Sequence, residues 1–129
     1  MEARGRDEFE RAFETMARER VDAVVVQSDP IFFTARRQVD PSTKYRLPGV
    51  FHARGFVESG GLTSYGGSLD YQFRRAAAYV DRILKGAWPG DLAVEQSAKI
   101  DFVINVKTAK ALRLTVSTEL LLRADEVIQ

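Results

Sequence analysis

The chain of 129 residues has no cysteine and a single histidine, His52. The missing cysteine excludes disulfides, iron–sulfur clusters, thiolate zinc sites and cysteine nucleophiles. One histidine excludes histidine-rich metal sites, and His52 has no nucleophile close by in the sequence. The motifs of phosphate-binding loops, nucleophile elbows and dinucleotide-binding folds are also missing. We therefore expect a protein that is not an enzyme and that carries no cofactor and no metal.

The chain also has almost no net charge and no long apolar run. Nineteen Lys and Arg against 18 Asp and Glu leave a formal charge of +1, which provides no field to attract nucleic acid or an anionic membrane. No run approaches the ~20 apolar residues of a membrane span. The first residues lack the apolar stretch, ~7–15 residues long, of a secretory signal. Because 45% of the residues are hydrophobic, we expect one soluble globular domain.

Helical and strand patterns alternate along the chain, which predicts an α/β fold: a three-layer αβα sandwich with a mostly parallel sheet. Proline at position 30 suits the first turn of a helix, and Pro41 is expected to stop that helix after Arg37. The expected helices cover Arg6–Arg20, Pro30–Arg37, Phe56–Glu58, Leu69–Lys85, Thr108–Leu112 and Ser117–Ile128, and the expected strands cover Val21–Val26, Leu47–Phe51, Leu62–Tyr65 and Lys99–Lys107.

Local patterns add detail to three of the strands. Val21–Val26 has no polar alternation, which predicts a strand buried on both faces. Gly66 and Gly67 predict a tight turn after the third strand. In Lys99–Lys107 apolar residues recur at every second position, which predicts a half-buried strand, and Thr108 is the expected cap of the helix that follows.

Polar residues follow two of these strands, where parallel sheets bind their ligands. Ser28 and Asp29 follow the first strand, and Ser64, Tyr65 and Gly66 end the third. A carboxylate can pair with a ligand ammonium, and hydroxyls with glycine-flanked NH groups can hold a ligand carboxylate. An aromatic ring nearby, such as that of Phe32, can cover an apolar ligand. The same residues also suit a plain helix cap and a plain turn, so residue type alone leaves both interpretations open.

Longer segments carry a resemblance to a known family. Gly60–Gly66, followed by Arg75–Pro89, resembles the ABC transporter substrate-binding protein family. More narrowly, it is similar to the branch whose members bind tryptophan or other aromatic amino acids. Ala23–Pro30, Phe102–Leu112 and Ala124–Ile128 support the resemblance, which therefore runs over nearly the whole chain.

This resemblance implies a fold of two α/β lobes, like periplasmic binding proteins of type 1, with the solute held between them. The chain corresponds to the C-terminal portion of such a protein. Residues 1–68 would form the core of the second lobe, and residues 69–129 the long helix, the crossing strand and the C-terminal helices. Carried over by position, the ligand-binding residues would be Ser28, Asp29, Ser64, Tyr65, Gly66 and Asp70, and Phe32 is added as the aromatic ring near the first strand end.

The implied function is the capture of a small solute, such as an amino acid, for an ABC permease, in the periplasm or another extracytoplasmic place. Which solute is bound stays open, because the first lobe would supply the other half of the pocket. A sensor domain of the same fold that feeds a regulator is an alternative. A receiver-like signalling domain is a weaker one, since Asp29 has no adjoining carboxylate.

Self-association of the isolated chain is a further expectation. In a lobe that lacks its first strands, Val21–Val26 would become a sheet edge. An apolar edge with unpaired NH and CO groups is a template for another chain. We therefore expect the chain alone to dimerise, swap elements or aggregate.

Overall fold

The computed structural model describes residues 6–34, 44–96 and 98–129, which form two compact units. Unit 1 combines the described part of Met1–Gly66 with Asp101–Gln129, and unit 2 is Gly67–Ile100. The chain thus leaves unit 1 once and returns to it, which is a different division from the expected one at residue 68. None of the described helices is long and apolar enough to cross a membrane.

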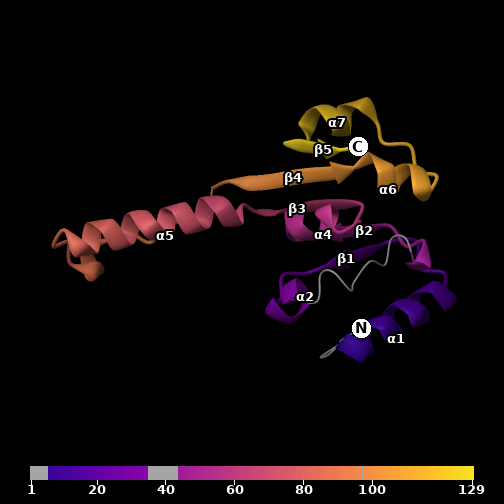
Figure 1. Ribbon diagram of the computed structural model, residues 1–129, viewed down its shortest axis with the longest axis horizontal. Coiled ribbons are helices and arrows are strands. Elements are labelled where there is room, and N and C mark those ends of the chain that lie inside the picture. Colours follow the sequence, from indigo (N-terminus) through magenta and orange to yellow (C-terminus); the bar gives the residue numbers. More distant parts are fainter. Residues whose placement is uncertain (1–5, 35–43, 97) are drawn as a thin grey trace. The chain divides into compact units, whose positions relative to one another are not determined.

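Unit 1 is a mixed α/β unit built on a five-stranded sheet of order β1-β2-β3-β4-β5 (Figure 1). The pairs β1–β2, β2–β3 and β4–β5 are parallel, which confirms the predicted α/β class and its mostly parallel sheet. The strands are β1 (Val24–Val26), β2 (Gly49–Phe51), β3 (Thr63–Gly67), β4 (Ile100–Asn105) and β5 (Glu126–Ile128). The helices of the unit are α1 (Arg6–Arg18), α2 (Pro30–Thr34), α4 (Arg54–Glu58), α6 (Val106–Ala111) and α7 (Thr118–Arg123).

Helix α1 is held by the apolar face that its sequence predicts. Phe9 and Phe13 recur at helical spacing, and both are buried in one cluster with Leu47. The Phe9 ring also stacks on Phe32 of α2, with the ring centroids 4.4 Å apart. Burying side chains of this size contributes about 2 kcal/mol each, so this cluster fixes both helices of the N-terminal part.

A second cluster lies beneath the ends of β1 and β2. Val26 and Phe51 end these two strands and pack with Ala53 and Phe56, and all four are buried. The rings of Phe51 and Phe56 stack with their centroids 5.0 Å apart. The packing therefore holds α4 against β2. It also aligns the last residues of β1 and β2 with each other.

A buried polar network joins the end of β4 to α4. The Asn105 Oδ1 atom accepts a hydrogen bond from the Thr108 amide at 2.9 Å, and its Nδ2 donates to the Val57 carbonyl at 3.2 Å. The Thr108 hydroxyl donates to the Gly60 carbonyl at 2.9 Å. Asn105 is therefore the N-cap of α6, and the prediction that Thr108 caps this helix is wrong. The strand ends two residues earlier than expected because Asn105 already satisfies the helix amides.

Two strands differ from the predicted burial. Val25 in β1 is 73% exposed, so β1 is not buried on both faces. Among the described strands, β1 lies at the edge of the sheet and pairs with β2 alone. In β4 the adjacent residues Val103 and Ile104 are both buried, so the predicted alternation fails because elements cover this strand on both faces.

The C-terminal ends of two elements, β3 and the last helix, also differ from the prediction. Gly66 and Gly67 belong to β3 instead of a tight turn. The last helix starts as predicted, with the Ser117 hydroxyl as its N-cap, but it ends at Arg123 instead of reaching Ile128. The reason is Asp125, whose amide donates to the Phe102 carbonyl and whose carboxylate accepts from the Phe102 amide, both at 2.8 Å. These bonds draw the segment after α7 alongside β4, where it forms β5.

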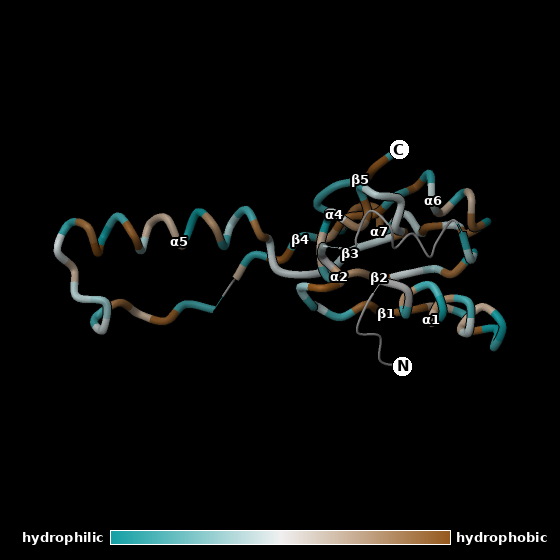
Figure 2. Tube along the Cα trace, turned by 60° about the horizontal axis from the view of Figure 1, so that its bottom comes forward, coloured by the Kyte–Doolittle hydropathy of each residue, from teal (hydrophilic) through white to brown (hydrophobic). Residues whose placement is uncertain are grey.

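Unit 2 consists mainly of α5 (Leu69–Leu84), as predicted, and of a segment that returns along it through a short 3₁₀ turn at Pro89–Asp91. Gly86 ends the helix with a φ of +100°, which an L side chain rarely adopts. Apolar and polar residues alternate along α5 (Figure 2). No residue of this helix is buried, and the described residues of unit 2 include no buried hydrophobic side chain.

One prediction lies partly outside the described residues. Helix α2 starts at Pro30, as expected. Its predicted continuation to Arg37 and its stop at Pro41 lie in residues 35–43, beyond the part of the chain that the structure describes.

Candidate functional site

The carboxyl ends of β1, β2 and β3 meet at one edge of unit 1, because these strands run parallel. Val26, Phe51 and Ser64 lie at one level across the three strands. The polar residues that come next in each strand or just after it therefore share this edge. In open α/β sheets ligands bind outside such strand ends. We refer to this edge as the rim.

Asp29 stands three positions beyond Val26, the last buried residue of β1. Its Oδ1 atom accepts a hydrogen bond from the Ile31 amide at 2.7 Å, in the first turn of α2. The side chain is half-buried, and the structure gives its Oδ2 atom no hydrogen bond to any described residue. Ser28, next to it, is exposed. Asp29 can therefore cap α2 and bind a ligand at the same time, since the cap uses one carboxylate oxygen and leaves the other.

His52 directly follows β2 and lies at the rim, although no nucleophile lies close to it in the sequence. Its ring contacts the Phe56 ring edge-on, with centroids 5.1 Å apart. Its Nδ1 atom is buried and has no hydrogen-bond partner among the described residues. Burial lowers the pKa of His52 from its ordinary 6.5, against the opposing influence of the Val26 and Gln27 backbone and the Asp29 charge. The signal in the sequence was its place at a strand end.

This lowered pKa predicts that stability falls as the pH falls through the ordinary range of histidine. Well above pH 6.5 the imidazole is neutral in both states, but as the pH falls through 6.5 the unfolded chain takes up a proton that the folded chain resists. We expect the urea midpoint to drop between pH 7.5 and pH 5.5, and the drop to be smaller in His52→Gln. Because His52 is the chain's one histidine, its NMR titration reads the pKa directly. A midpoint that changes equally in both proteins would contradict the assignment.

Strand β3 brings three predicted residues to the rim. Ser64 is 1% exposed, and its hydroxyl has no hydrogen-bond partner among the described residues. Tyr65 is 59% exposed and contacts the Phe102 ring edge-on, with centroids 5.9 Å apart. At Gly66 the backbone passes so close to His52 that a Cβ atom would lie 2.0 Å from the His52 carbonyl oxygen. The glycine is therefore required for β3 to run beside the end of β2.

The other two predicted residues lie elsewhere. The partly buried Phe32 ring stacks on Phe9 and packs against both hydrophobic clusters of unit 1. Asp70 is exposed in the first turn of α5, where its charge favours the helix dipole, and it belongs to unit 2. The structure thus brings together Ser28, Asp29, Ser64, Tyr65 and Gly66, and it adds His52.

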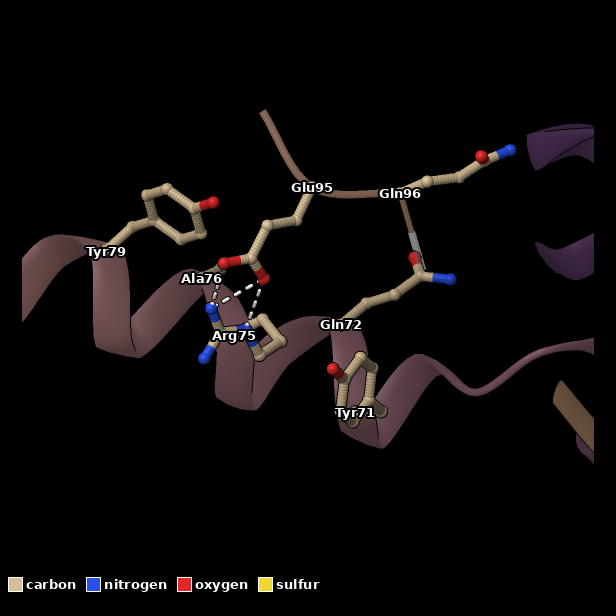
Figure 3. Close-up of a pocket in the computed structure, with 7 residues that line it drawn as sticks. All are labelled: Tyr71, Gln72, Arg75, Ala76, Tyr79, Glu95 and Gln96. Carbon is tan, nitrogen blue, oxygen red and sulfur yellow. Dashed lines mark hydrogen bonds and ion pairs between the residues drawn. The ribbon is translucent and has the colours of Figure 1, made fainter. Parts of the chain in front are cut away.

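A pocket of about 220 Å³ lies in unit 2, between α5 and the returning segment (Figure 3). The Arg75 guanidinium forms hydrogen bonds to both Glu95 carboxylate oxygens, and the Tyr79 hydroxyl donates to the Ala93 carbonyl. The pairing raises the pKa of Arg75 and lowers that of Glu95. The pocket is lined by Tyr71, Gln72, Arg75, Ala76, Tyr79, Glu95 and Gln96, none of which was a predicted site residue. Its charged groups already satisfy each other.

Comparisons with known proteins agree with this architecture. The sequence model of a family described as ABC transporter substrate binding protein matches residues 2–128. No curated protein gives a significant match. A solved conserved domain protein from Vibrio cholerae O1 biovar El Tor is 27% identical, with a TM-score of 0.84 over 97% of this chain and 42% of its own. An ABC domain from Streptococcus pneumoniae, solved in complex with L-Trp, is 28% identical, with a TM-score of 0.84 over 95% of this chain and 41% of its own.

A third solved structure shows the fold at lower similarity. The ligand-free, open form of CD0873, a substrate binding protein with adhesive properties from Clostridium difficile, is 20% identical, with a TM-score of 0.64 over 95% of this chain and 41% of its own. The chain therefore spans well under half the length of the solved proteins that it matches.

Proposed function

Because the chain belongs to the family of ABC transporter substrate binding proteins, we propose that it forms part of the solute-binding component of an ABC importer. The rim of unit 1 would hold one side of the solute. The chain would correspond to the C-terminal portion of a two-lobed protein, which delivers its solute to an ABC permease outside the cytoplasm. The chain's short span relative to the solved proteins supports this assignment.

The solute that suits the rim best is an amino acid. The observation that carries this proposal is Asp29, whose half-buried carboxylate has one oxygen in the cap of α2 and the other left to meet a ligand ammonium. A charge-assisted hydrogen bond of this kind is about twice as strong as a neutral one. The Tyr65 ring stands exposed at the same edge and offers an apolar surface. The L-Trp complex of the Streptococcus pneumoniae protein supports this solute class.

The test is an NMR titration of the 129-residue chain with each of the twenty amino acids at millimolar concentration. Half a cleft leaves much of the ligand in water, so we expect a Kd of ~1 mM or weaker. The shifts should concentrate at the rim. Asp29→Asn should weaken binding about tenfold, which corresponds to ~1.4 kcal/mol. Failure of every amino acid to shift any rim signal would contradict the proposed solute class.

The matched control is Asp22→Asn. Asp22 is an exposed aspartate at the other end of β1, so its substitution changes the net charge equally without touching the rim. We expect its affinity to equal that of the unaltered chain. Equal weakening in both variants would mean that the effect comes from net charge, and the role of Asp29 would be wrong.

A further inference from the structure

His52 and Asp29 come together at the rim from two neighbouring strands. Val26 of β1 and Phe51 of β2 are partners in the parallel register. The residues that come next, Gln27 and His52, therefore leave the two strands at the same level. Asp29 lies two residues beyond Gln27, and its negative charge acts on the His52 imidazole. The one histidine of the chain is thus within electrostatic reach of the carboxylate that we assign to the solute ammonium.

The packing around His52 holds the residue in place. Its neighbours in the chain, Phe51 and Ala53, are both buried. On the β3 side the backbone at Gly66 runs directly against the His52 carbonyl group. The imidazole itself lies edge-on against the Phe56 ring of α4. The ring therefore keeps its place at the rim, and its protonation state is what can change there.

The neutral form of the ring suits these surroundings. The Nδ1 atom of His52 is buried and has no hydrogen-bond partner among the described residues. A neutral imidazole can leave one nitrogen without a proton, whereas an imidazolium carries a proton on both. Protonation therefore adds a positive charge and a buried donor, and both need a negative partner.

Among the described groups around the ring, Asp29 is the one that can balance this charge. The strands β1 and β2 and helix α2 have no titratable group within their bounds, and β3 contributes only the phenol of Tyr65. On α4, Arg54 is already paired with Glu58 at 2.6 Å and with Glu126 at 2.7 Å. The Asp29 carboxylate uses one oxygen in the cap of α2 and leaves the other.

We propose that His52 competes with the solute for Asp29. When the imidazole takes up a proton, its positive charge pairs with the Asp29 carboxylate, which then binds a solute ammonium less well. The rim would hold its solute at neutral pH and release it as the pH falls through the range in which His52 titrates. By linkage, a bound solute in turn makes the imidazole harder to protonate. The inference rests on the proposed function in that it takes Asp29 as the ammonium contact.

The first test needs no solute. The pKa of His52 is read from its imidazole NMR signal, which is unique in this chain, in the unaltered protein, in Asp29→Asn and in Asp22→Asn. We expect the pKa to fall by about 0.5 or more in Asp29→Asn, because the balancing charge is lost. Asp22→Asn removes an exposed charge at the other end of β1 and should leave the pKa unchanged. An unchanged pKa in Asp29→Asn would overturn the proposal.

The second test uses the amino acid that shifts the rim signals most in the NMR titration of the proposed function. Its Kd is measured at pH 7.5 and pH 5.5, with circular dichroism to establish that the chain is folded at both. We expect the Kd to rise about two- to tenfold at pH 5.5, the range that one competing proton allows for a histidine titrating between about pH 5.5 and 6.5. In His52→Gln the ratio of the two Kd values should be close to one.

The reciprocal measurement separates competition from a purely structural role of His52. A saturating concentration of the same amino acid should lower the pKa of His52 in the unaltered chain. An equal ratio of Kd values in His52→Gln and the unaltered chain, or a His52 pKa that the solute does not change, would overturn the proposal. If no amino acid binds, the proposed function is contradicted, and the first test still decides whether His52 and Asp29 pair.

Discussion

Replacing Gly66 with alanine is expected to cost about 3 kcal/mol or more of the free energy of unfolding. The added Cβ atom would lie 2.0 Å from the His52 carbonyl oxygen and 2.9 Å from its carbonyl carbon. Both are backbone atoms at the end of β2, held in place by the buried Phe51 and Ala53 on either side. They cannot swing aside as a flexible side chain would, so β3 has to separate from β2. Urea denaturation followed by circular dichroism measures the loss.

The control for this substitution is Gly86→Ala. Gly86 has a φ of +100°, and an added Cβ there meets no atom within 4 Å. Its cost comes from backbone conformation alone and should be about 1 kcal/mol. If Gly66→Ala were no more destabilising than Gly86→Ala, then β3 would not pass His52 as closely as described.

Asn105→Ala is expected to cost about 3 kcal/mol. The substitution removes the N-cap of α6, which contributes about 1 kcal/mol. It also leaves the buried Thr108 amide and the Val57 carbonyl without their partner, which costs a further 1–3 kcal/mol or so. Because the network joins α6 to α4, the loss should appear in the unfolding of unit 1 as a whole, measured by urea denaturation.

Ser117→Ala provides the comparison for Asn105. Ser117 caps α7 in the same way, with its hydroxyl accepting from the Leu120 amide at 3.3 Å, but it is exposed. Water can replace that hydrogen bond, so the loss should be below about 1 kcal/mol. Equal losses at the two caps would show that the buried network around Asn105 adds nothing to the cap itself.

The sequence predicted the strands and helices best where one residue dominates the local energy. Pro30 placed the start of α2, Ser117 placed the start of α7, and Phe9 with Phe13 marked the buried face of α1. Predictions failed where a partner distant in sequence decides the outcome. Asp125 forms β5 because of Phe102 in β4, and no local pattern contains that pairing.

The candidate site shows the same contrast between local sequence signals and partners that are distant in sequence. Ser28 and Asp29 were predicted at the rim from their position after a strand, and the parallel sheet brings Tyr65 to the same edge. The residues next to His52 in the sequence predict no role for it, because its surroundings come from β1, the segment after it and α4. The Phe32 ring stacks on Phe9, a contact that an aromatic residue beside a polar cluster does not reveal in the sequence.

The excursion of the chain through Gly67–Ile100 has a consequence for the order of folding. Strands β1, β2 and β3 follow one another along the chain, and each can pair soon after its neighbour forms. β4 lies beside β3 in the sheet, but it is synthesised only after all of unit 2. Closing so long a loop costs chain entropy before any contact of β4 compensates for it, and distant pairings are slow to form. We therefore expect the N-terminal three strands to assemble first, and the buried bonds of Asn105 to complete the sheet last.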